Sequence, residues 1–391
     1  MNEKMRRLGE ERSAIRELYE YGLRMKELGE ENVFDFSLGS PSVPTSESVQ
    51  REIGRLLKET PPEVLHGYTS AAGLYSAREA VARQLQKTYG AKISAKHVYL
   101  TCGAAASLTA AIHALAEAGD EFVVISPYFP EYRVFIEGAG GKCVEANADP
   151  RFHLNFSALE SAIGKNTKAV VINSPNNPTG AVYTAEEIAE LSRLLQRKSR
   201  EKGNPVYLIS DEPYRELTYG APAPFPAGAY ENTLVCYSFS KSLSLAGERI
   251  GYIAVNDGCA DADALFAAVS GAARSLGFVC APALFQRVAE KCVGQTADFG
   301  AYRSNRKLLT ESLAGMGYAV SPPEGAFYLF VKSPEADAKA FSERAKKHGL
   351  LLVPSDSFGI TGYVRISYCV PEERIRRALP VFRALIAEYV G

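Results

Sequence analysis

Short apolar runs alternate with longer helix-forming stretches between residues 97 and 255, and this alternation limits the possible folds more than any other feature of the chain. The runs at 168–173 and 206–210 are almost continuously apolar, which is typical of strands covered on both faces. Similar runs lie at 97–101, 121–126, 233–237 and 250–255. Strands that alternate with helices form a mostly parallel sheet, so the sequence predicts a large α/β domain.

Two capping-box patterns predict where helices begin. Thr184 with Glu187, and Ser76 with Glu79, each stand at the start of a long helix-forming stretch. In this pattern a hydroxyl and a carboxylate satisfy backbone N–H groups that the first helical turn leaves free. We therefore expect both stretches to be helical.

The 391 residues are more than one hydrophobic core usually holds, so two domains are expected. After residue 285 isolated strands and amphipathic helices replace the regular alternation. We expect residues 41–284 to form the large domain and residues 285–391 to form a smaller α+β domain. Residues 1–40 should pack with the smaller domain.

Charge and cysteine usage indicate a soluble cytoplasmic protein that binds small molecules. The net charge is −1, and the sequence has no basic stripe of the kind that would predict nucleic-acid binding. The apolar region 264–285 is interrupted by Arg274 and Pro282, so it does not predict a membrane span, and the charged N-terminus is unlike a secretion signal. The seven cysteines show no CxxC or Cys/His spacing, which favours free thiols and no metal site.

One lysine stands in a serine-rich bend after the apolar run at 233–237. A lysine removed from solvent can lose its proton and attack a carbonyl, so Lys241 could form an imine with an aldehyde cofactor. Ser238, Ser240 and Arg249 would supply hydroxyls and a guanidinium for a phosphate on the same cofactor. By itself a Ser-Xaa-Ser-Lys pattern is more often a solvated surface bend.

Other polar and aromatic side chains follow the ends of predicted strands. In parallel α/β sheets, ligands bind beyond the carboxyl ends of the strands. The residues at or just past such ends are Tyr128, Asn177, Asp211, Tyr214 and Lys241. The sequence therefore predicts one ligand site along this edge of the sheet.

A turn of small residues, Gly103-Ala104-Ala105, follows the strand at 97–101 and opens a helix. The first turn of a helix offers free N–H groups and the positive end of the helix dipole, so it can bind an anion. Tight packing of the helix on the sheet would explain the same small residues.

These motifs, in this order, resemble those of the class I/II aminotransferases, which are fold-type I enzymes that use pyridoxal 5′-phosphate. The resemblance covers nearly the whole length. It is carried by Ser37-Leu38-Gly39-Ser40-Pro41, Tyr68 with Gly73, Gly103-Ala104-Ala105, Tyr128, Asn177-Pro178-Thr179-Gly180, Asp211-Glu212-Pro213-Tyr214, Ser238-Phe239-Ser240-Lys241 with Arg249, and Val364-Arg365-Ile366-Ser367.

The resemblance implies roles at the centre of the site. Lys241 is similar to the Schiff-base lysine, which also moves a proton between the substrate α-carbon and the cofactor. Asp211 resembles the carboxylate that pairs with the pyridine nitrogen and keeps it protonated. Asn177 and Tyr214 resemble the donors to the phenolic oxygen of the cofactor, and Tyr128 resembles the aromatic that stacks on its ring.

The resemblance also implies how phosphate and substrate are held. Arg365 is similar to the arginine that binds the substrate α-carboxylate, with Gly39 and Asn177 nearby. The phosphate would be bound by the N–H groups of the 103–105 turn and by the serine-rich bend with its arginine. Tyr68 is similar to the tyrosine that reaches the phosphate of a neighbouring subunit, which implies a homodimer with shared sites.

Two positions depart from the family pattern. Cys102 stands where many relatives place a hydroxyl residue beside the phosphate, and Arg274 is a candidate by rough position only for an arginine that binds a second substrate carboxylate. The expected function is transfer of an amino group from an L-amino acid to a 2-oxo acid, with aspartate and 2-oxoglutarate as the candidate pair. The alternatives are a C–S β-lyase, which would use much the same residues, and an aromatic or alanine-type aminotransferase.

Two classes without aminotransferase chemistry fit the sequence poorly. A cofactor-binding regulator would carry a basic recognition helix before the domain, and the motifs already begin by residue 37. A nucleotide-binding α/β protein would carry G-x-G-x-x-G after its first strand or GxxxxGK[ST], and neither stands here.

Overall fold

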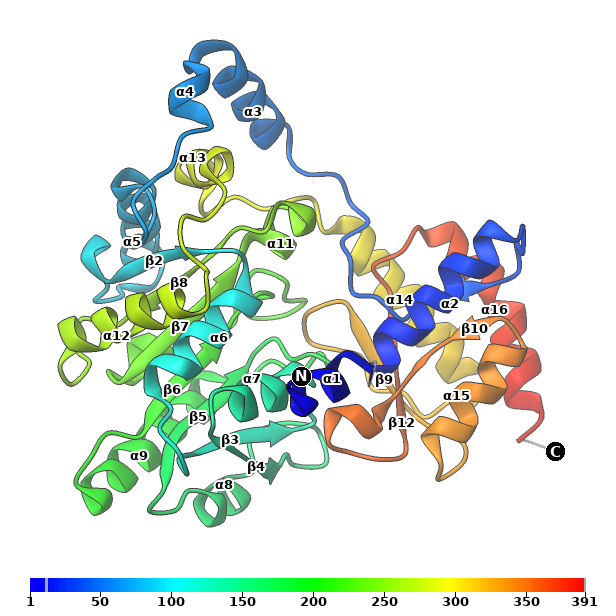
Figure 1. Cartoon of the computed structure of the whole chain (residues 1–391). Coiled ribbons are helices and arrows are strands. Elements are labelled where there is room, and N and C mark those ends of the chain that lie inside the picture. The colour runs from blue at the N-terminus through cyan, green and yellow to red at the C-terminus, as the bar shows by residue number, and fades with distance from the viewer. Residues whose placement is uncertain (11–12, 390–391) are drawn as a thin grey trace.

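A seven-stranded sheet forms the centre of the large domain in the computed structural model, which describes residues 1–10 and 13–389 (Figure 1). The order across the sheet is β2 (Val98–Thr101), β8 (Gly251–Val255), β7 (Thr233–Ser238), β6 (Tyr207–Asp211), β5 (Thr167–Asn173), β3 (Glu121–Ser126) and β4 (Lys142–Asn147). Strand β8 is antiparallel to both neighbours, and the pairs from β7 to β4 are parallel. The predicted α/β fold with a mostly parallel sheet is confirmed.

Helices cover both faces of this sheet, because successive side chains of each strand point to opposite sides. Val170 and Ile172 pack in the core beneath the helices on one face, and Ala169 and Val171 pack in the core on the other. The first face is covered by α8 (Phe156–Ala162) and α9 (Ala185–Lys202), and the second by α6 (Ala104–Leu115), α7 (Glu131–Gly138) and α12 (Ala262–Ser275).

A third core lies near the β2 edge and corrects the expected domain boundary. It joins α3 (Glu47–Glu59), α4 (Pro62–Leu65), α5 (Tyr75–Tyr89) and α13 (Ala283–Cys292). Helices α3 and α4 stand at the top of Figure 1, above α13. Because Val288 and Cys292 are buried in this core, the expected boundary at residue 285 falls inside a large-domain helix. We therefore propose that the small domain begins after Cys292.

The small domain contains two short sheets covered by helices. One sheet has the order β11 (Val353–Pro354), β12 (Tyr363–Ser367) and β9 (Tyr328–Lys332), and its neighbouring strands are antiparallel. The other pairs β1 (Phe34–Asp35) with β10 (Leu350–Leu351) in parallel. Its helices are α2 (Ala14–Glu27), α14 (Gly300–Gly315), α15 (Ala338–Lys347) and α16 (Glu372–Ala387). Tyr302, Phe341 and Phe382 lie in its core.

The N-terminal segment contacts both domains rather than the small domain alone. Helix α2 packs on the small domain through Leu18, which lies in one cluster with Leu351 and Val353. Helix α1 (Glu3–Glu10) lies beside the large domain, where Lys4 Nζ donates to the carbonyl of Glu137 at 2.6 Å (Figure 1). Helix α2 and strand β1 thus pack with the C-terminal segments, and α1 lies beside the large domain.

Short single-turn helices complete the described chain. They are α10 (Pro226–Ala229), α11 (Phe239–Ser242), η1 (Ala95–His97), η2 (Ala246–Glu248) and η3 (Ser355–Phe358).

One predicted capping box forms and the other does not. Glu187 N donates to Thr184 Oγ1 at 3.2 Å, and Thr184 N donates to Glu187 Oε2 at 2.7 Å, which confirms the start of α9. The prediction at Ser76 is wrong, because α5 begins one residue earlier and the Ser76 hydroxyl donates to Glu290 of α13 at 2.6 Å. A tertiary partner replaces the local cap.

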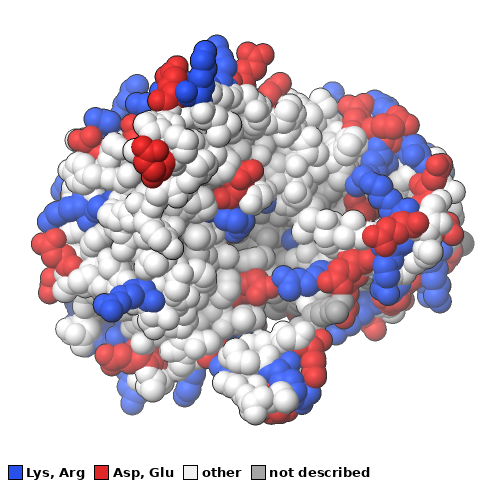
Figure 2. Space-filling view, turned by 45° about the horizontal axis from the view of Figure 1, so that its top comes forward, with Lys and Arg blue, Asp and Glu red and all other residues white. Residues whose placement is uncertain are grey.

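Charges of both signs are interspersed over the face shown in Figure 2, and a hollow lies between its two halves. Among the helices of residues 1–10 and 13–389, none is long and apolar enough to span a membrane.

Candidate active site

A cavity of about 260 Å³ lies at the carboxyl ends of β5, β6 and β7, where residues of both domains meet. The structure brings most of the predicted site residues together around it. Those that line it are Gly39, Ala104, Ala105, Asn177, Asp211, Tyr214, Ser238, Ser240, Lys241, Arg249 and Arg365.

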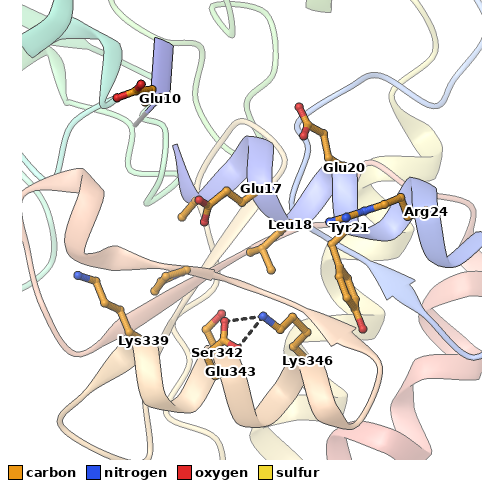
Figure 3. A pocket seen from close by; sticks show the side chains of 12 residues that line it. Glu10, Glu17, Leu18, Glu20, Tyr21, Arg24, Lys339, Ser342, Glu343 and Lys346 are labelled. Carbon is orange, nitrogen blue, oxygen red and sulfur yellow. Dashed lines mark hydrogen bonds and ion pairs between the residues drawn. The ribbon is translucent and has the colours of Figure 1, made fainter. Parts of the chain in front are cut away.

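A larger pocket, of about 680 Å³, lies between α2 and α15 and holds none of these residues (Figure 3). One of its cations is already engaged with neighbours, because Lys346 pairs with Glu343 and lies 5.5 Å from the ring centroid of Tyr21. The chemistry expected from the sequence belongs to the smaller cavity.

Lys241 enters the cavity from α11, directly after β7. Its Nζ donates to the carbonyl of Gly39 at 2.5 Å, so the two domains meet at this amine. Burial lowers the pKa of Lys241 to about 8, and the positive charges of Arg249 and Arg365 act in the same direction. Gly39 must lack a side chain, because a Cβ there would overlap the hydroxyl of Tyr328.

Asp211 is buried at the end of β6 with one carboxylate oxygen engaged and one free. Oδ2 accepts a hydrogen bond from the hydroxyl of Tyr132 at 2.5 Å. No group of the described chain donates to Oδ1. Burial raises the pKa of Asp211 to about 7, and the charge of Glu212 adds to the rise while the Tyr132 bond opposes it. A cationic donor at Oδ1 would reverse this shift.

Arg365 is buried at 1% exposure and points its guanidinium into the same cavity. Nη1 donates to Asn177 Oδ1 at 2.9 Å, and Nη2 donates to the carbonyl of Ser37. Its Nε has no acceptor among the described residues. The ring of Tyr328 lies 4.6 Å from the guanidinium carbon. This cation is therefore held by neutral groups.

Tyr214 and Asn177 present polar groups beside Lys241 and Asp211. The Tyr214 hydroxyl lies 2.7 Å from the hydroxyl of Tyr328, and burial raises the pKa of Tyr214 well above its usual value. Since Asn177 Oδ1 accepts from Arg365, the amide nitrogen of Asn177 remains as a donor. Both side chains can thus donate hydrogen bonds to an oxygen in the cavity.

Hydroxyls, a guanidinium and a helix start form a cup at one end of the cavity. Arg249 Nη1 lies 3.4 Å from Ser240 Oγ, and Ser238 Oγ lies 2.8 Å from the same oxygen. Helix α6 begins at Ala104, after Gly103, whose φ is +85°. A Cβ on Gly103 would lie 2.7 Å from Arg249 Nη2, so this glycine lets the arginine approach the helix start. The cup suits a phosphate.

Tyr128 lies outside the cavity lining, and Phe129 stands there instead. The Tyr128 hydroxyl donates to Glu145 at 2.7 Å and its ring packs close to Gly359, away from the site. Both residues belong to the same aromatic turn, and they differ in whether the side chain points into the cavity.

Two further predicted residues do not reach the cavity of their own chain. Tyr68 is 99% exposed, and Arg274 is exposed in the last turn of α12. The loop that holds Tyr68 is joined to the segment after α12, because Cys280 N donates to the carbonyl of Ala71 at 3.2 Å.

Several residues in or directly behind the cavity lining were missed by sequence reasoning. Tyr132 donates to Asp211, and Asn173 bridges the site: Nδ2 donates to the Asp211 carbonyl at 2.9 Å and Oδ1 accepts from Asn177 N at 2.7 Å. Asn173 ends a predicted strand, which was a usable signal. The others that line the cavity are Ile15, Leu38, Leu108, Phe129, Pro213, Ala246 and Tyr328.

Comparison with known proteins assigns this arrangement to a family. The family model described as "Aminotransferase class I and II" matches residues 31–382. The chain belongs to the class I and II aminotransferase family. It is a pyridoxal-phosphate-dependent enzyme that moves the amino group of an L-amino acid to a 2-oxo acid.

Named relatives are similar over most of their length. The aspartate/prephenate aminotransferase of Thermus thermophilus is 32% identical, over 89% of each chain, and the aspartate aminotransferase of Thermotoga maritima is 32% identical, over 89% of this chain and 90% of the relative. An amino transferase structure from Eubacterium rectale has a TM-score of 0.96 and 51% identity, covering 100% and 99% of the two chains. The Thermus thermophilus aspartate aminotransferase with maleate has a TM-score of 0.86 and 29% identity, covering 97% and 98%.

The residues present in this aminotransferase fit pyridoxal phosphate. The buried and unpartnered Asp211 Oδ1 suits a ring N–H, and the cup at Ser238, Ser240 and Arg249 suits the phosphate. Lys241 lines the same cavity and is the only lysine of its described lining.

Proposed function

We propose that this aminotransferase uses Lys241 as its covalent attachment point and takes L-aspartate as amino donor with 2-oxoglutarate as acceptor. When bound, pyridoxal phosphate supplies an aldehyde that condenses with amines and a ring that accepts electrons from the substrate α-carbon. The observation that carries the proposal is that three groups line one cavity: the Lys241 amine, the buried Asp211 carboxylate with its free Oδ1, and the buried Arg365 guanidinium, which has no carboxylate partner among the described residues.

Lys241 would act first as a nucleophile and then as a base. With a pKa of about 8, a substantial fraction of the Lys241 amine is neutral near physiological pH, whereas the amine of an exposed lysine is almost fully protonated. Once released, the same amine would carry the proton from the substrate α-carbon. Lys241 Nζ bonds the carbonyl of Gly39 and shares the cavity with Arg365, which supports a substrate site beside this amine.

Asp211 would stabilise positive charge on the ring nitrogen of the cofactor. Its free Oδ1 would accept that N–H, while Tyr132 and Asn173 hold the carboxylate in place. Tyr214 and Asn177 would donate to the phenolic oxygen.

The phosphate would be held by the cup. Ser238, Ser240, Arg249 and the N–H groups of Ala104 and Ala105 are its donors. For the aromatic that stacks on the ring, we propose Phe129 in place of Tyr128, since it lies in the cavity lining.

Arg365 would bind the substrate α-carboxylate, with Gly39 close by. A buried guanidinium without an anionic partner favours a carboxylate strongly, because the pair recovers part of the cost of burial. The relative from Thermus thermophilus is described with maleate, a dicarboxylate, and this supports an acidic donor.

We further propose a homodimer with shared sites. Tyr68, Val64 and Leu57 are exposed on the α3–α4 arm and its following loop, and a second copy would cover them. In the dimer, Tyr68 of one copy would bind the phosphate of the other, and Arg274 would bind the second carboxylate of aspartate there. We place the enzyme in the cytoplasm, because its seven cysteines are free.

A spectrum with trapping tests the covalent proposal. The purified enzyme should show a visible absorbance band that disappears on borohydride reduction, and mass spectrometry should find the added mass on Lys241. Lys241→Ala should show neither. Trapping at another lysine, or no band at any pH, contradicts the proposal.

A panel of donors tests the substrate. Aspartate, alanine, aromatic and branched-chain amino acids would each be assayed with 2-oxoglutarate and pyruvate. The proposal requires aspartate to give the highest kcat/KM. Pyruvate release from cystathionine without an added 2-oxo acid would instead identify a β-lyase.

Mixing two impaired variants tests the shared site. Lys241→Ala and Tyr68→Ala homodimers should each be weakly active, and their hybrid should recover activity because one of its sites has both residues. No recovery on subunit exchange contradicts the shared dimer.

A further inference from the structure

A buried hydrogen-bond network lies behind α11, on the side away from the cavity. The Tyr237 hydroxyl lies 2.8 Å from Ser242 Oγ and 2.9 Å from Glu216 Oε1. Tyr237 and Ser242 are both buried, and Ser242 directly follows Lys241. The network therefore touches the four-residue helix that carries the amine.

The chemistry of the three groups sets the direction of these bonds. Glu216 Oε2 is buried and has no donor among the described residues, which leaves the Tyr237 hydroxyl as the side-chain donor to this carboxylate. A phenol has one proton, so a Tyr237 that donates to Glu216 must accept from Ser242. The chain thus runs from serine to tyrosine to carboxylate.

The tyrosine at the middle of this chain is held firmly by its surroundings. Its ring stacks on Tyr252 with centroids 4.8 Å apart and meets Phe239 edge-on at 5.2 Å. The guanidinium carbon of Arg215 lies 4.6 Å from the Tyr237 ring centroid, and Arg215 also pairs with the buried Glu212. The phenol is a fixed anchor point.

The other end of the network reaches the small domain. The Ser242 carbonyl accepts from Ala297 N at 2.7 Å, in the segment that leads into α14. Glu216 lies two residues after Tyr214 on the segment that follows β6. Tyr214 lines the cavity and Glu216 does not. The network thus links the segments that carry Lys241 and Tyr214 from behind.

We propose that Tyr237 and Ser242 are positioning residues, which together hold the short helix α11 and so orient the Lys241 amine. Four residues form too few helical hydrogen bonds to hold their own shape, so α11 depends on such external bonds. Neither side chain lines the cavity, and so neither touches substrate. The inference rests on the proposed role of Lys241.

The test measures the Lys241 amine in the apoenzyme, without cofactor. Competitive labelling with acetic anhydride across a pH series, read by mass spectrometry, gives the pKa of this one lysine. Tyr237→Phe keeps the ring and its stacking but removes the hydroxyl. We expect its Lys241 pKa to rise from about 8 toward the usual 10.5, because the freed turn lets water reach the amine. Ser242→Ala should cause the same rise, and the double variant should add little more.

Tyr318→Phe is the matched control. It also removes one buried tyrosine hydroxyl bond, to the carbonyl of Phe382 at 2.8 Å, but in the small-domain core. Its Lys241 pKa should equal that of the wild type. An unchanged Lys241 pKa in Tyr237→Phe, a rise of equal size in Tyr318→Phe, or fully additive shifts in the double variant would overturn the proposal.

Two further measurements separate other outcomes. If Tyr237→Phe does not fold, Ser242→Ala decides alone, and an unchanged pKa there rejects the inference. Borohydride trapping at a lysine other than Lys241 would reject the proposed function, whereas correct trapping with unchanged labelling would reject only the positioning role.

Discussion

Two buried arginines of this aminotransferase lie in opposite electrostatic settings. Arg215, 6% exposed, has its own carboxylate partner, Glu212, and is surrounded by aromatic rings. Arg365, 1% exposed, has an amide oxygen and a backbone carbonyl, and no carboxylate of the described chain lies within ion-pair distance. The first cation is neutralised by the fold, and the second is not.

The difference separates a structural cation from a binding cation. Burying a charge without a partner costs several kcal/mol, by general estimates, so a fold retains such a group at the expense of stability. Each guanidinium has one nitrogen without a partner, Nε in Arg365 and Nη2 in Arg215, but Arg365 faces the cavity. Arg215 faces the rings of Tyr89, Phe225 and Tyr237 instead. We expect the two residues to respond oppositely to substitution.

The largest effect on activity is expected at the binding cation. Arg365→Leu removes charge-assisted bonds worth about 1.5–3 kcal/mol each, so kcat/KM for every amino acid should fall about 10²–10⁴-fold. Because the variant also removes an unpaired buried charge, the melting temperature of the apoenzyme should stay equal or rise. Steady-state kinetics and thermal melts check both. A normal KM with a large loss of stability would make Arg365 structural.

Asp211 extends the comparison to carboxylates. Asp211→Asn should lower turnover about 10²-fold or more, because the ring nitrogen loses its counter-charge. The folded pKa of about 7 lies above the unfolded value near 3.8, so the apoenzyme loses stability as pH rises through this interval.

Thermal melts of apoenzyme at pH 5 and pH 8 measure that linkage. Asp211→Asn should gain melting temperature over the wild type at pH 8 and gain less at pH 5. Glu160→Gln, at an exposed carboxylate paired with Arg197, is the control for loss of a carboxylate outside the cavity. An equal gain at both pH values would contradict a raised pKa.

The structural cation should affect stability instead of binding. Arg215→Leu leaves Glu212 buried without its partner, which should cost about 3–5 kcal/mol of unfolding free energy. Denaturant unfolding measures this cost, and the double variant Arg215→Leu with Glu212→Leu should recover part of it. KM for the amino acid should stay close to the wild-type value. A large rise in KM without a loss of stability would remove the contrast with Arg365.

The smallest effect is expected at the aromatic turn. Phe129→Leu removes ring stacking of about 0.5–1.5 kcal/mol, which should weaken cofactor binding about 2–13-fold. Tyr128→Phe removes a hydroxyl that bonds Glu145 outside the cavity and should leave cofactor affinity unchanged. Cofactor titration of the two apoenzymes checks the assignment. Weaker binding in Tyr128→Phe alone would restore Tyr128 as the stacking residue.

Sequence alone predicted the parallel sheet and the residues at its carboxyl edge. Apolar runs and helix signals are local properties of the sequence. In a parallel sheet the carboxyl ends of the strands lie at one edge, so Asp211 and Lys241 lie at that edge independently of the conformation of the loops. The Lys241 amine, the Asp211 carboxylate and the hydroxyls of Ser238 and Ser240 could therefore be predicted from the sequence.

Tertiary packing decided what the local patterns leave open. Phe129 rather than Tyr128 faces the cavity, Ser76 bonds Glu290 instead of capping its helix, and α13 joins the large domain. It also decided which buried arginine has a carboxylate partner. Each of these contacts depends on which segment, distant in the sequence, packs against the residue in question. The pattern of a few neighbouring residues does not contain that information.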